Sequence, residues 1–178
     1  MYTKIFKFAA SIGVCQLAGI IGSIFTASTV SSWYPTLIKP NFSPPSWLFA
    51  PVWVLLYFLM GISLYLIWQN RAKDNKKSLI VFGIQLILNV FWSLLFFGLM
   101  SPLYGLIDIL FLLAAIILTI VFSFKISSYA AILLVPYLVW VSFATIINYS
   151  IVLLNYSHSI VFQIFSLFSL KTTGYKKL

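Results

Sequence analysis

Five runs of apolar residues, each long enough to cross a bilayer, alternate with polar segments along the chain. A helix rises about 1.5 Å per residue, so roughly 20 apolar residues cross the hydrocarbon core, and a helix satisfies its own backbone amides there. The pattern predicts an all-α integral membrane protein, a five-transmembrane-helix bundle. The predicted spans are Ile5–Ala27, Trp47–Gln69, Ser78–Leu99, Leu103–Phe124 and Tyr129–Leu154.

The segments between these runs are short, except for residues 28–46, which hold Lys39 and four of the seven prolines. Little of the chain remains for a soluble domain, so residues 1–155 are predicted to form one membrane domain. The apolar part of the C-terminal extension, residues 156–178, is too short to span a bilayer. We expect this extension to lie at the interface or to be disordered.

Composition supports burial in lipid, because 62% of the 178 residues are hydrophobic and only 7% are charged. The net charge of +9 does not indicate nucleic-acid binding, since the basic residues lie at span ends and turns. Basic residues favour the inner side of a membrane, which predicts the N-terminus inside and the C-terminus outside; the host membrane is left open. The inner set is Lys4, Lys7, Arg71, Lys73, Lys76, Lys77 and Lys125.

Small residues recur every four positions in the first span and predict a close helix contact. The sequence leaves open whether the contacting helix belongs to the same chain or to a second protomer. The two rows are Ser11, Cys15, Gly19 and Ser23, and Ala18, Gly22 and Thr26.

The chain lacks the residues of most catalytic and metal sites. It has two aspartates, no glutamate, one cysteine and the single His158, which excludes a paired-carboxylate hydrolase and predicts no metal site. No phosphate-binding glycine loop is present, and no cofactor is required. Asp108 is the exception, an acid inside the fourth span. We interpret it as a structural anchor in preference to a proton relay.

Aromatic and amide side chains share helix faces in three spans, because they are spaced three or four residues apart. Amides in lipid need partners, so these faces are expected to turn inward and enclose a flat, largely apolar pocket. The alternative is a tight bundle with interfacial tryptophans, and it applies best to Trp33, Trp47 and Trp68. The rows are Trp53, Tyr57, Gly61 and Tyr65; Gln85, Asn89, Trp92 and Phe96; and Trp140, Ala144, Asn148 and Asn155.

Prolines stiffen the loop between the first two spans and predict an ordered lid that brings Trp33 and Tyr34 to the pocket. Pro51 falls in a first helical turn, where proline is tolerated. Pro136 is expected to kink the fifth span beside Trp140.

Three long motifs resemble the tryptophan-rich sensory protein / translocator protein family, also called the peripheral benzodiazepine receptor family. The resemblance extends from about Ile5 to Asn155. The motifs are WYPTLIKPNFSPPSWLFAPVWVLLYFLMGISLYLIW (Trp33–Trp68), QLILNVFWSLLFF (Gln85–Phe97) and PYLVWVSFATIINYSIVLLN (Pro136–Asn155).

The resemblance implies a five-helix bundle, commonly homodimeric, with a ligand pocket under the first loop. Its ligands are porphyrins such as protoporphyrin IX, isoquinoline or benzodiazepine drugs and, in animal members, cholesterol. Trp53 and Trp140 match tryptophans associated with porphyrin binding and light-dependent breakdown, and Asp108 matches a family aspartate. Residues that match positions around the ligand are Tyr34, Phe49, Tyr57, Asn89, Trp92, Phe96 and Ala144.

The chain departs from the family in the sterol motif, because no Lys or Arg soon follows Tyr156. The favoured hypothesis is a membrane sensory or translocator protein that binds protoporphyrin IX, with Asn89, Asn148 or Tyr34 orienting the ligand under the gating loop. One alternative is a light-dependent porphyrin-degrading enzyme that uses Trp53 and Trp140. The other is a transporter of porphyrin or lipid-like solutes. The expected partners are membrane lipid, the porphyrin and a second protomer, without nucleic acid.

Overall fold

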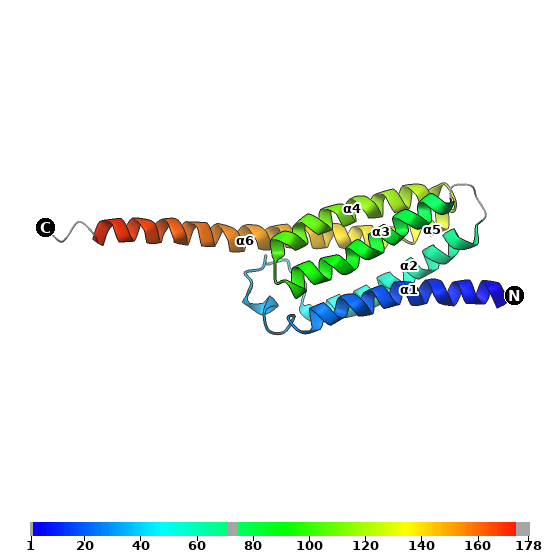
Figure 1. Cartoon of the computed structure of the whole chain (residues 1–178), viewed down its shortest axis with the longest axis horizontal. Helices are drawn as coiled ribbons and strands as arrows, with labels where there is room; N and C mark the ends of the chain where they lie inside the picture. The colour runs from blue at the N-terminus through cyan, green and yellow to red at the C-terminus, as the bar shows by residue number, and fades with distance from the viewer. Residues whose placement is uncertain (1, 71–74, 174–178) are drawn as a thin grey trace.

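The computed structural model describes residues 2–70 and 75–173, with side chains described as far as Tyr156. Within these residues it contains helices and no strand (Figure 1), and five helical stretches are long and apolar enough to span a membrane. The predicted all-α, five-helix membrane fold is confirmed. The elements are α1 (Tyr2–Ala27), η1 (Tyr34–Thr36), η2 (Ser46–Leu48), α2 (Phe49–Gln69), α3 (Asn75–Ser93), the π-helix η3 (Leu94–Gly98), α4 (Pro102–Phe124), α5 (Ser128–Ile132) and α6 (Val135–Thr173).

The fifth span is divided between α5 and α6, which meet just before Pro136. Proline has no amide hydrogen to donate to the carbonyl of Ile132, so the helical ladder is interrupted there. The predicted kink therefore takes the form of a break. The helix then continues to Thr173. The prediction that residues 156–178 form an interfacial or disordered extension stays a prediction. Their side chains beyond Tyr156, and the chain end beyond Thr173, lie outside the described residues.

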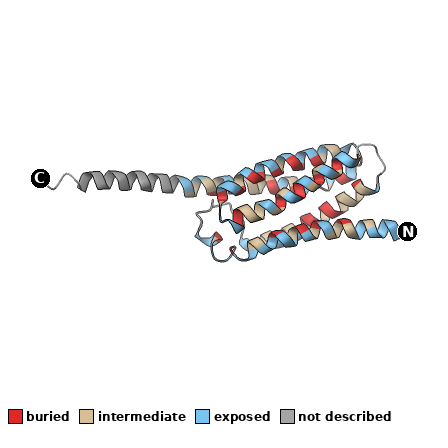
Figure 2. Cartoon of the chain, in the orientation of Figure 1, coloured by how far each residue is buried: buried red, intermediate tan, exposed pale blue. Residues whose placement is uncertain are grey.

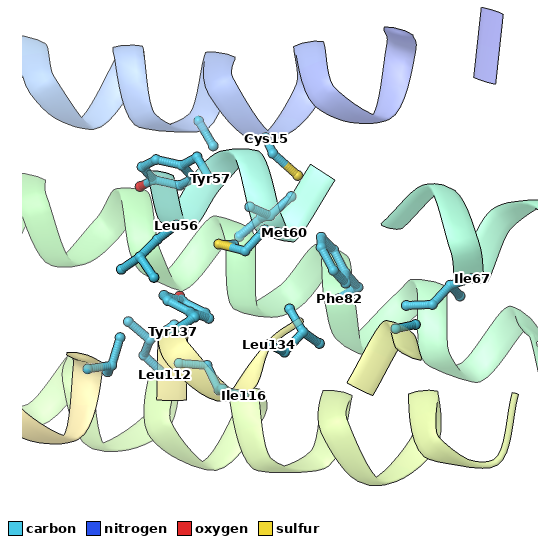
Figure 3. Close-up of a cluster of buried hydrophobic side chains, with 14 of the residues drawn as sticks. Cys15, Leu56, Tyr57, Met60, Ile67, Phe82, Leu112, Ile116, Leu134 and Tyr137 are labelled. Atoms are coloured by element: carbon cyan, nitrogen blue, oxygen red, sulfur yellow. The ribbon is translucent and has the colours of Figure 1, made fainter. Parts of the chain in front are cut away.

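The core lies along the axis of the bundle, where buried residues of all five spans meet (Figures 2 and 3). Tyr137, Phe82 and Met60 are among its largest fully buried side chains. Large apolar side chains such as Leu55, Phe111 and Val139 are exposed on the outer surface. That arrangement suits a protein whose outer surface is solvated by acyl chains.

The small-residue rows of α1 pack against helices of the same chain. A methyl group on Gly61 of α2 would lie 2.8 Å from Cα of Ile12, and one on Gly19 would lie 2.6 Å from the ring of Tyr57. A Cβ at Gly22 would meet the Ser93 hydroxyl at 3.0 Å. The contact that the sequence left open is therefore internal at these positions.

A π-helical turn ends the third span and changes which side chains face inward. The amide of Leu99 donates to the carbonyl of Leu94 at 2.8 Å, five residues back. Phe96 and Phe97, although adjacent, are both buried in a second hydrophobic cluster, together with Tyr34, Ile147 and Ile151. A wide turn of this kind is common near functional sites. It places two phenyl rings at the loop end of the bundle.

Candidate functional site

A cavity of about 370 Å³ lies at the loop end of the bundle, between α1, α2, the α3–η3 segment and α6. Its volume falls within the range of about 300–1,000 Å³ that is usual for small-molecule sites. The wall is mostly apolar, and no residue with a formal charge lines it among those described. Such a wall suits an apolar ligand whose charged groups stay outside.

Two stacked aromatic pairs contribute to the wall. Trp53 and Tyr57 on α2 lie with ring centroids 5.5 Å apart and planes at 30°. Trp92 on α3 and Phe96 in η3 lie 5.1 Å apart with planes at 23°. Residues four apart on a helix share a face, which is why each pair stacks. The cavity wall therefore contains flat aromatic surfaces from two different helices.

Behind the first pair, Asn89 links two buried tyrosines. The Tyr57 hydroxyl donates to Oδ1 of Asn89, and Nδ2 of Asn89 donates to the Tyr137 hydroxyl at 2.8 Å. Asn89 is 3% exposed and does not line the cavity. Its amide holds Tyr57 in place from behind.

Asn148 on α6 lines the cavity, but both ends of its amide are already engaged. Its Oδ1 accepts a hydrogen bond from the Trp92 indole at 3.2 Å, and its Nδ2 donates to the Pro102 carbonyl at 2.8 Å. Hydroxyl groups in the wall come from residues that include Tyr34 and Ser93. Burial raises the pKa of Tyr34, so its phenol keeps its proton at neutral pH and is able to donate a hydrogen bond.

The loop between α1 and α2 covers the end of the bundle. Lys39 Nζ donates to the carbonyls of Tyr34 and Leu37, each at 3.0 Å, and lies 4.9 Å from the Tyr34 ring centroid. The Asn155 side chain accepts from the Ile38 amide at 3.1 Å and donates to the Ile38 carbonyl at 2.9 Å. These contacts hold the loop in one ordered shape.

A profile of the TspO/MBR family matches residues 11–154. The chain belongs to the TspO/MBR family. It is 50% identical to the "Tryptophan-rich protein TspO" of Archaeoglobus fulgidus over 152 residues, which cover 85% of this chain and 99% of that protein. It is 36% identical to the human "Translocator protein" over 149 residues, 82% of this chain and 85% of the human one.

A more distant relative is the "Tryptophan-rich sensory protein" of Cereibacter sphaeroides, 28% identical over 84% of this chain and 92% of that protein. The family resemblance found in the sequence motifs is thus confirmed. Family membership and five candidate spans make this TspO/MBR protein a multi-pass integral membrane protein. Its orientation stays a prediction.

The structure brings eight of the eleven predicted ligand residues to one cavity. These eight are Tyr34, Phe49, Trp53, Tyr57, Trp92, Phe96, Ala144 and Asn148. The other three, Asn89, Trp33 and Trp140, do not line it. Trp33 packs edge-on against Phe96, with centroids 5.6 Å apart, and Trp140 packs against Phe49 at 5.8 Å. The two outlying tryptophans support the wall from behind.

Asp108 lies away from the cavity of this TspO/MBR protein. Its side chain is 7% exposed, and Oδ2 is buried without a hydrogen-bond partner among the described residues. Those residues also contain no cluster of three or more His, Cys, Asp or Glu that could hold a metal ion. The choice between anchor and proton relay for Asp108 stays a prediction.

One whole wall of the cavity was not predicted from the sequence. It comes from α1, whose small residues were interpreted only as a helix contact. The same spacing that brings helices together also leaves room beside them where the side chains are short. The α1 residues that line the cavity are Gln16, Gly19, Ile20, Gly22, Ser23 and Thr26.

Proposed function

We propose that this TspO/MBR protein binds a planar tetrapyrrole, protoporphyrin IX or a close relative, in the cavity beneath the α1–α2 loop. The observation that carries the proposal is the pair of stacked aromatic walls, Trp53 on Tyr57 and Trp92 on Phe96. Stacked aromatic contacts favour flat conjugated rings, and the uncharged wall favours the apolar ring system over its carboxylates. Tyr34 and Ser93 supply polar contacts at the edge.

The experiment is a titration with protoporphyrin IX that follows quenching of tryptophan fluorescence in vesicles, with hemin and cholesterol for comparison. Trp92→Ala is expected to weaken protoporphyrin binding at least tenfold, because it removes one stacking surface. Trp47→Ala is the matched control, since Trp47 is 71% exposed and lies outside the cavity wall. Equal affinity in both variants would contradict the proposal.

A second candidate function is light-dependent breakdown of the bound porphyrin. The observation that favours it is the position of Trp53, which lines the cavity and also contacts Tyr137 edge-on, 6.2 Å between centroids. An indole beside an excited porphyrin is a suitable electron donor. Transport of porphyrin or lipid-like solutes is the third proposal; it is supported by the name of the human relative, and flux across proteoliposomes tests it.

A homodimer in the lipid bilayer is the proposed assembly. Its support is the large apolar area on the outside of the bundle, which acyl chains or a second protomer cover. Cross-linking in vesicles, followed by electrophoresis, distinguishes a dimer from a monomer.

A further inference from the structure

The cavity is bounded unevenly, and the exposed part of its wall comes from one side only. The lining residues of α3, η3, α6 and the first part of the loop, Val30 and Tyr34, are buried or half-buried. The exposed lining residues belong to α1, η2 and α2, and they include Ile20, which is 57% exposed, and Val54, which is 61% exposed. The cavity is therefore least covered on the side of α1, η2 and α2.

The gap has a closed lower end. There α1 and α2 touch backbone to backbone at Gly61 and Ile12, and Gly19 fits against the Tyr57 ring. One turn nearer the loop than Ile12, Nε2 of Gln16 donates to the Val54 carbonyl at 3.2 Å. From that hydrogen bond towards the loop, the exposed cavity-lining residues of α1 and α2 follow. We call this opening, flanked by Ile20, Ser23, Ala50 and Val54, the slot.

The slot lies within the stretches of α1 and α2 that are long and apolar enough to span a membrane. Ile24, one turn after Ile20 and 64% exposed, and Leu55, next to Val54 and 57% exposed, continue the exposed apolar surface of α1 and α2. The loop end is shut by contrast. Tyr34 is buried there against Phe96 and Phe97, and the side chain of Asn155 pairs with Ile38.

We propose that the ligand enters and leaves sideways from the bilayer through the slot, while the α1–α2 loop is a fixed roof and not the gate. This inference rests on the proposed function for the identity of the ligand. It defines the ligand class as flat apolar molecules that partition into the bilayer. Their carboxylates remain near the headgroups, because the described cavity wall offers no charge to pair with them.

Thiol labelling tests the slot without any ligand. Ser93→Cys places a thiol on the cavity wall, and the unmodified chain gives the background because Cys15 is buried. The lipid-soluble reagent N-phenylmaleimide is expected to label the new cysteine in vesicles, whereas a charged, membrane-impermeant methanethiosulfonate in the water phase is not. Labelling by the charged reagent, or by neither reagent, would overturn the proposal.

Filling the slot tests the route more sharply. Ile20→Trp is expected to slow labelling of the new cysteine at least tenfold. Ile21→Trp is the matched control, because Ile21 is the next residue, is 46% exposed and does not line the cavity. If the two tryptophan variants are labelled equally fast, the slot is not the entrance.

Exchange of protoporphyrin IX between vesicles and protein completes the test. Ile20→Trp is expected to slow both uptake and release. Asn155→Ala removes the two hydrogen bonds between α6 and Ile38 of the loop and is expected to leave both rates within about twofold. Faster exchange in Asn155→Ala together with an unaffected Ile20→Trp identifies the loop as the gate and overturns the proposal. If the protein takes up no porphyrin but keeps the predicted labelling pattern, the proposed ligand is wrong and the proposed entrance through the slot stands.

Discussion

The indole of Trp92 donates a hydrogen bond to Oδ1 of Asn148, 3.2 Å away, so one bond joins the α3 and α6 walls of the cavity. The same amide donates to the Pro102 carbonyl and thereby holds the start of α4. Asn148 is 1% exposed, and both ends of its amide already make a hydrogen bond within the protein. The polar group that the sequence offered as a ligand contact instead positions an aromatic wall.

Asn148→Leu is therefore expected to weaken protoporphyrin IX binding by roughly tenfold, about 1.4 kcal/mol, by releasing the Trp92 ring from its fixed orientation. Near-ultraviolet circular dichroism of the ligand-free protein should lose part of its tryptophan signal. Thr145→Val is the control, because the Thr145 hydroxyl bonds only to the Val141 carbonyl of its own helix. An unchanged tryptophan signal in Asn148→Leu would show that Asn148 does not position Trp92.

Gly61→Ala is expected to destabilise the bundle, because the added methyl group would lie 2.8 Å from the Ile12 backbone and force α1 away from α2. The expected cost is about 1–3 kcal/mol, the usual range for overpacking. Gly83→Ala is the matched control in α3, where nothing lies within 4 Å of the added methyl group. There the exchange should stabilise the helix by about 0.5–1 kcal/mol. Unfolding by denaturing detergent measures both changes, and equal effects would exclude the close contact.

Much of the fold was predictable because lipid imposes strict rules on length and hydrogen bonding. The first four spans lie within a few residues of their expected bounds, and the fifth begins within one residue of its expected start. The break before Pro136 follows from one missing amide hydrogen. Helical spacing also predicted that Trp53 would share a face with Tyr57, and Trp92 with Phe96. These features depend only on residues close together in the chain.

The parts that were missed depend on contacts between distant segments or on a local change of helix type. The row Trp140, Ala144 and Asn148 was expected to face the pocket together. Ala144 and Asn148 do so, but the Trp140 ring lies against Phe49. Phe97 joins the cavity wall because the third span ends in a π turn. No residue pattern in that span predicts the extra residue in the turn.

The linked side chains of Tyr57, Asn89 and Tyr137 give a prediction about stability. Tyr137→Phe removes one hydrogen bond, and bonds of this kind in membrane bundles contribute about 0.6 kcal/mol on average. Asn89→Ala leaves two buried phenols unpaired, so its cost should be larger, about 1–3 kcal/mol. Detergent unfolding of both variants tests the order. If Tyr137→Phe is as costly as Asn89→Ala, the amide does not serve both tyrosines.

Trp53 and Trp140 were both predicted to act on the bound porphyrin, but they should differ in photochemistry. Trp53 lines the cavity, whereas Trp140 lies outside its wall and packs against Phe49 and Phe143. Electron transfer weakens steeply with distance, so Trp53→Phe is expected to slow light-dependent loss of the protoporphyrin IX spectrum at least tenfold. Trp140→Phe should change it by less than threefold. Illumination with and without oxygen, at ligand concentrations that saturate each variant, separates a photochemical effect from lost affinity. Equal slowing in both variants would place the two indoles at similar distances from the porphyrin and contradict the assignment of Trp53 as the donor.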